Sequence, residues 1–192
     1  MSDFESAAAH FNAEVERHGW GQFCDPANAF ILPECRALAE IWSAAAPPDG
    51  LPRRDAMTAR KLKPYLPRLI LVELVEEAPP RLRFRLIGTI ITNTLSERTG
   101  KYFDDPSATP QQTARWTQSA LLALKARRPV RFFMASAGSV TGEMLCLPLA
   151  DEEGRPRFVL AYGCYDPLRD WTAREAPARP KPIRAEHASR AG

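Results

Sequence analysis

Residues 81–87 read Arg81-Leu-Arg-Phe-Arg-Leu-Ile, so charged and apolar side chains alternate along this run. A period of two is typical of a strand that has one face on a core and the other face in water. We therefore expect Leu82, Phe84 and Leu86 to face the core of an antiparallel sheet, while the three arginines of the run face solvent.

Further runs with strand propensity lie on both sides of this segment. One precedes it at 69–75, and three follow at 130–135, 141–149 and 157–165, with a hairpin turn at 151–154. Helical spacing and capping residues predict helices at 3–17, 33–45, 59–66, 89–97 and 110–127. This order predicts an α+β domain, in which a five-stranded antiparallel sheet carries helices on one face and is preceded by N-terminal helices.

The 192 residues are 45% hydrophobic and 26% charged, which is ordinary for a globular protein. The net charge of +3 lies in residues 167–192, where six basic residues stand against three acidic ones, so residues 1–166 sum to zero. Prolines and the loss of apolar periodicity predict that this segment is disordered. We therefore divide the chain into an N-terminal helical segment (1–50), a sheet domain (51–166) and a Pro/Arg-rich disordered tail (167–192).

No apolar run reaches the roughly 18 to 20 residues that a membrane span needs, and the first residues show no secretory signal. We therefore expect a cytoplasmic protein. The four cysteines lie far apart and form no C-x-x-C motif, which predicts reduced thiols that pack as small apolar side chains.

The motifs that mark common enzyme classes are missing. The sequence holds no glycine-rich phosphate loop, no H-E-x-x-H helix and no nucleophile elbow. The three histidines, His10, His18 and His187, all lie outside the predicted sheet domain, which argues against a Ser-His-Asp site, a Cys-His site or a haem ligand there. We predict a non-catalytic protein without a metal site, and we assign no catalytic residue.

Polar residues between 89 and 96 stand beside an apolar sheet. They indicate either helix caps and solvent-facing positions or the lining of a small-ligand cavity, and the nearby aromatic residues either form a simple core or surround that cavity. The candidate lining residues are Leu86, Thr89, Asn93, Phe103, Trp116 and Tyr162. Basic residues at 53–54, 60–63 and 81–85 indicate a solvated face or a docking face for an acidic protein partner.

Five segments occur in an order that resembles a known family, namely 51–55, 66–74, 81–89, 98–104 and 143–154. They are similar to the single-domain bacterial PAS family, once catalogued as a domain of unknown function, over roughly residues 33–166. The resemblance implies a five-stranded PAS sheet in the sheet domain, N-terminal helices that form a homodimer, and sensory or regulatory signalling through a protein partner such as a histidine kinase. It supplies no ligand or cofactor. Because no cysteine lies between Cys35 and Cys146, covalent flavin photochemistry is not expected.

The function expected from the sequence is therefore that of a PAS signalling protein, which senses a small ligand in the cavity or docks onto a signalling partner. A ligand-free dimerisation or docking adaptor is the alternative. An enzyme of unrecognised type and a nucleic-acid binder that uses the basic tail come after it.

Overall fold

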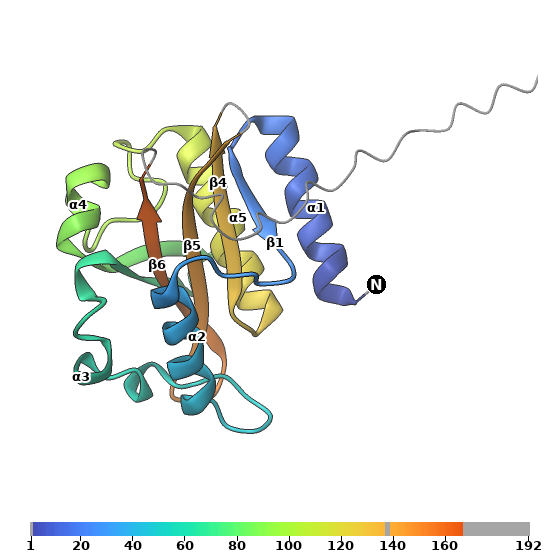
Figure 1. Ribbon diagram of the computed structural model, residues 1–192. Helices are drawn as coiled ribbons and strands as arrows, with labels where there is room; N and C mark the ends of the chain where they lie inside the picture. Colours follow the sequence, from blue (N-terminus) through green and yellow to red (C-terminus); the bar gives the residue numbers. More distant parts are fainter. Residues whose placement is uncertain (1, 137–138, 167–192) are drawn as a thin grey trace, which may run out of the picture.

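A computed structural model describes residues 2–136 and 139–166 (Figure 1), and the predicted disordered tail lies outside these residues. The helices are α1 Asp3–His18, α2 Pro33–Ala45, α3 Ala59–Leu62, α4 Thr89–Leu95 and α5 Pro110–Ala126, with the short 3-10 helices η1 Arg54–Ala56 and η2 Leu66–Arg68. The strands are β1 Gln22–Asp25, β2 Leu69–Val75, β3 Arg81–Ile87, β4 Val130–Ser136, β5 Ser139–Ala150 and β6 Pro156–Tyr165. Within this part of the chain, no helix combines the length and the hydropathy of a membrane span.

The strands form a single antiparallel sheet in the order β1-β4-β5-β6-β2-β3. The predicted α+β class and the antiparallel sheet are confirmed, and β2 to β6 coincide with the five expected strands. The sequence did not predict β1, which adds a sixth strand beside β4 and places Asp25 opposite Arg131.

Helices cover both faces of this sheet, whereas the sequence analysis placed them on one. We call the side that carries α1 and α5 the inner face, and the side that carries α2 and residues 51–68 the outer face. The inner core includes Phe11, Phe84 and Phe132, and the outer core includes Leu38 and Leu147. Figure 1 shows α2 in front of β5 and β6, with α5 behind the sheet.

Capping determines where the covering helices begin. A reciprocal capping box starts both α1 and α5, because in each case the N-cap and the third helical residue exchange hydrogen bonds. The helix α2 begins with Pro33, whose missing N–H costs nothing in a first turn. Near its end, Trp42 donates its indole N–H to the Pro148 carbonyl at 2.7 Å, which ties α2 to β5.

A β-bulge interrupts the alternation of β3. Phe84 and Leu86 pair with consecutive residues of β2, which leaves Arg85 without a partner in the register. The extra residue reverses the alternation, so Phe84 stays in the inner core, Leu86 turns to the outer face, and Ile87 enters the inner core. The prediction that Leu86 shares a core with Phe84 was therefore wrong, and the Leu86 side chain is 38% exposed.

Other parts of the chain cover the two edge strands. Along β3, the backbone of residues 100–103 exchanges hydrogen bonds with Leu82 and Phe84. Along β1, the side-chain amide of Asn12 donates to the Cys24 carbonyl at 3.0 Å and accepts from the Cys24 N–H at 2.8 Å. These contacts occupy outward-facing backbone groups of Leu82, Phe84 and Cys24, which an added strand would need.

Candidate functional site

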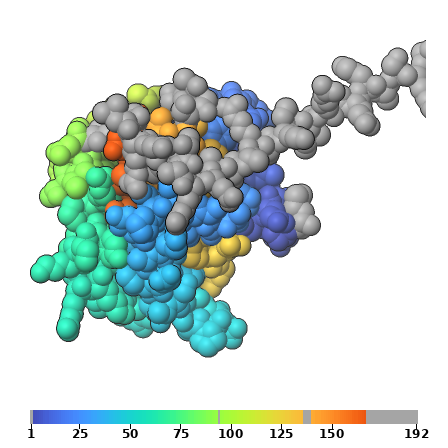
Figure 2. All heavy atoms as spheres, in the orientation of Figure 1, coloured from blue at the N-terminus to red at the C-terminus, as the bar shows by residue number. Residues whose placement is uncertain are grey.

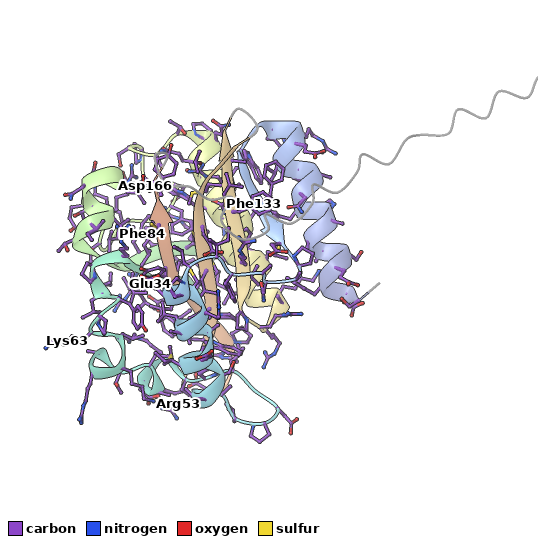
Figure 3. All side chains as sticks on the ribbon, in the orientation of Figure 1. Glu34, Arg53, Lys63, Phe84, Phe133 and Asp166 are labelled. Atoms are coloured by element: carbon purple, nitrogen blue, oxygen red, sulfur yellow. The ribbon has the colours of Figure 1, made fainter. Side chains whose placement is uncertain are left out.

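Three aromatic rings pack against one another between the inner face and α5, where the sequence analysis expected a ligand cavity. The ring centroids of Phe84, Phe103 and Trp116 lie 4.5 to 5.8 Å apart in tilted and T-shaped pairs (Phe84 is labelled in Figure 3). The guanidinium of Arg98 covers the Trp116 ring at 5.4 Å from its centroid. Two of the predicted lining residues, Phe103 and Trp116, thus contact each other as part of a packed core.

The other four predicted lining residues lie elsewhere. Leu86 and Tyr162 are on the outer face, where the Tyr162 ring meets Tyr65 edge-on at a centroid distance of 6.0 Å. Burial raises the pKa of Tyr162 to about 12. Thr89 and Asn93 are exposed on α4. The structure therefore does not bring the six residues to one cavity, and ligand binding by them stays a prediction.

A groove of about 640 Å³ opens on the outer face, between residues 53–66 and the strands β2, β3 and β6. Its floor is apolar and is formed by Met57, Leu62, Leu66, Leu69, Leu71, Leu86, Phe158 and Leu160. Figure 2 shows the teal segment that borders the groove next to the blue surface of α2, and Arg53, labelled in Figure 3, belongs to the charged rim. A concave apolar surface with a charged rim is suited to binding.

Three arginines surround one carboxylate on the β3 side of the groove. Glu73 on β2 accepts a hydrogen bond from Arg83 Nη2 at 2.9 Å, and Arg157 Nη2 lies 3.4 Å from its other oxygen. The Nε atom of Arg85 lies 3.6 Å from the carboxylate. Burial alone would raise the pKa of Glu73, but the Arg83 hydrogen bond and the three positive charges hold it below its ordinary value. This arginine cluster carries two net positive charges, and two of its members, Glu73 and Arg157, line the groove.

Acidic residues lie on the rim of the groove at the start of β6. The β5–β6 turn carries Asp151, Glu152 and Glu153, which all line the groove. Arg155 binds Asp151 at 2.9 Å and Glu153 at 3.2 Å, whereas Glu152 is exposed to solvent. Arg53, which pairs with Ala150, lies beside this turn, so the groove combines an apolar floor with a rim of mixed charge.

A buried ion-pair network, which the sequence analysis missed, lies on the outer face near β1. Arg131 on β4 binds Asp25 on β1 at 2.8 Å and also binds Glu143 on β5, and each of the three side chains is at most 2% exposed. Glu143 accepts the backbone N–H groups of Ile31 and Leu32 at 2.9 and 2.7 Å. The network thus fixes the connection between β1 and α2 to the sheet. Its three charged residues do not line the groove.

The titratable groups do not form a reaction centre in the groove, whose lining contains no histidine, cysteine or serine. All four cysteines are free and buried, as predicted. Burial raises the pKa of Cys24 to about 12 and also raises the pKa values of Cys35 and Cys146, so these thiols stay protonated near neutral pH. Over residues 2–136 and 139–166, no group of three or more His, Cys, Asp or Glu side chains could hold a metal ion. What the groove offers is apolar contact and charge.

A second groove of about 560 Å³ runs between α1 and α5. It contains Leu121, which is 39% exposed, together with acidic residues of α1 and Lys125 of α5. Its charged residues, Asp3, Glu14 and Lys125, form no cluster like that around Glu73. We therefore regard the groove on the outer face as the stronger candidate site.

Comparison with known proteins gives one match. A family model described as a PAS domain matches residues 32–165, which include α2 and the strands β2 to β6 and leave out α1 and β1. No curated protein and no solved structure matches the chain.

Proposed function

The chain belongs to the PAS domain family, a family of sensory and signalling domains, and on this premise we propose that it is a non-catalytic cytoplasmic regulator that docks a signalling partner on the outer face of its sheet. The observation that carries the proposal is the open groove, whose apolar floor includes the exposed side chain of Leu86. An exposed leucine on an apolar floor that is rimmed by charges is typical of an interaction surface.

Two further observations support docking rather than ligand sensing. The rings of Phe84, Phe103 and Trp116 pack against one another in the region where a ligand cavity was expected. The groove, in contrast, opens to solvent and presents charges of both signs. A protein surface with complementary charges would match it better than a small apolar ligand would.

The experiment places a photo-crosslinking residue at Leu86 in the full chain, inside the cells that naturally make it. The matched control places it at Leu121 in the second groove, which is equally exposed, at 39% against 38%. Docking predicts a discrete crosslinked protein from position 86 and none of the same mass from position 121. The absence of a protein crosslink at position 86, or identical products at both positions, would contradict the proposal.

Native mass spectrometry of the gently purified protein tests the alternative. Docking without ligand sensing predicts that each subunit has the mass of the chain alone. A retained small molecule would instead favour ligand sensing. The same spectrum tests the expected homodimer, because it separates monomer from dimer.

A further inference from the structure

The arginine cluster has more positive charge and more donors than its own carboxylate can satisfy. Arg83, Arg85 and Arg157 share Glu73, which leaves two net positive charges. The buried Nε atoms of Arg83 and Arg157 have no hydrogen-bond partner among the described residues. Arg85 is the most accessible member, with a side chain that is 43% exposed. A second carboxylate, brought by a partner, would offset part of this excess charge.

The bulge in β3 brings this charge next to the apolar floor. Consecutive residues of a regular strand point to opposite faces, but here Arg85 reaches Glu73 on the outer face and Leu86 lines the same groove. Glu73 and Arg157 of the cluster line the groove, and Arg85 lies at its border through its contact with Glu73, so an occupant of the groove meets positive charge beside Leu86. That occupant must present an acidic group beside an apolar one.

The covered edges and the composition of the lining select a helix among the common recognition modes. An added strand needs a free sheet edge, and residues 100–103 and Asn12 occupy the edges of β3 and β1. A proline-rich segment needs an aromatic groove, and the lining here has a single aromatic residue, Phe158. An amphipathic helix supplies apolar side chains at spacings of three and four residues, with charged residues on the borders of the apolar stripe. Nucleic acid and anionic lipid fit poorly, because Glu152 and Glu153 would repel phosphates at the same groove.

We infer that the groove receives an amphipathic α-helix of a partner protein, which packs apolar side chains against Leu71 and Leu86 and places acidic side chains near Arg85 and Arg157. The inference rests on the docking function proposed above and names the chemistry of the partner.

A displayed library of random peptides, selected on the immobilised full chain, tests this inference. We expect the enriched sequences to carry Asp or Glu beside apolar residues at spacings of three and four. Synthetic copies of these peptides, measured by fluorescence anisotropy, should lose affinity at least about tenfold on Arg85→Glu and on Leu86→Glu. Lys125→Glu, which reverses a basic charge in the second groove, is the matched control and should leave the affinity within about twofold. Circular dichroism verifies that each variant keeps its fold.

The outcomes separate this inference from the docking function. Peptides that depend on Leu86 but are neutral or basic, or whose affinity survives Arg85→Glu, would overturn the acidic helix and leave docking on the groove intact. If no enriched peptide depends on Leu86, both the acidic helix and the docking function fail.

Discussion

Replacing Arg131 with methionine should lower the free energy of unfolding by about 4 kcal/mol, a large part of the roughly 5–15 kcal/mol that holds a typical domain folded. The change keeps most of the side-chain volume and removes the positive charge that Asp25 and Glu143 share. Both carboxylates then remain buried without a counter-charge.

The magnitude follows from the surroundings of the two carboxylates. Breaking a buried ion pair by removing one partner costs roughly 3–5 kcal/mol. Because Arg131→Met leaves two buried carboxylates without a counter-charge, its cost in free energy of unfolding should lie at the upper end of this range. Asp25 and Glu143 each keep two backbone N–H donors, at 2.7 to 3.0 Å, which reduces the loss. A value near the middle of the range results.

Urea unfolding followed by tryptophan fluorescence measures this loss, and Arg155→Met is the matched control. Arg155 also binds carboxylates, namely those of Glu76, Asp151 and Glu153, but its side chain is 52% exposed, so its replacement should change the unfolding midpoint far less. Equal losses in the Arg131 and Arg155 variants would refute the reasoning.

Four further predictions test the core, the bulge, the arginine cluster and the thiols. Trp116→Ala should cost about 3–5 kcal/mol in urea unfolding, while Asn93→Ala stays within about 0.5 kcal/mol, and similar losses would contradict the placement of these residues. In thermal melts followed by circular dichroism, Leu86→Glu should change the midpoint little, whereas Ile87→Glu should prevent folding or lower the midpoint strongly, and the reverse order would argue against the bulge. Because the pKa of Glu73 is lower in the folded protein than its ordinary value of 4.5, the stability that it contributes is complete above pH 4.5 and is lost as the pH falls through the folded pKa. Glu73→Gln should therefore be less stable than the wild type at pH 7, and the difference in urea midpoints should shrink in acid; a constant difference would contradict the ion pairs. None of the four thiols should react quickly with Ellman's reagent in the native protein and all four should react in urea, so a fast native thiol would contradict their burial.

Local patterns predict much of this fold. The helix expected at 33–45 matches α2 at both ends, because Pro33 marks its first turn and the two prolines after Ala46 prevent it from continuing. The strands β2 and β3 likewise match the expected ranges. β1 gave no such signal, because four residues are too few to show a period and its pairing partner, β4, begins more than 100 residues later.

The candidate site was harder to predict, because it depends on contacts between distant strands. Arg81–Ile87 alternates regularly in sequence, yet its pairing with β2 inserts Arg85 as a bulge and sends Leu86 to the other face. Tyr162 was expected beside Trp116, but β6 turns it towards α2 and Tyr65. The docking face for an acidic partner, indicated by the basic residues at 81–85, stays a prediction. The division of the chain into a helical segment and a sheet domain at residue 50 also stays a prediction.

The buried network escaped detection for a similar reason. An arginine or a glutamate in a strand usually lies on a solvated face, so Arg131 and Glu143 looked ordinary in the sequence. Their burial becomes favourable when Asp25 and two backbone N–H groups from the chain before α2 converge on them. No local pattern encodes that convergence.

The pairing of β1 with β4 also determines the order in which strands of the sheet can pair during synthesis. Asp25 lies opposite Arg131, a separation of 106 residues, and a ribosome that adds roughly 5–20 residues per second needs about 5 to 20 s to cover it. Throughout that interval β4, the strand that pairs with β1, is missing, and Asp25 lacks its ion-pair partner Arg131. β1 must therefore wait for β4, so the complete sheet closes only after residues 130–136 have been made.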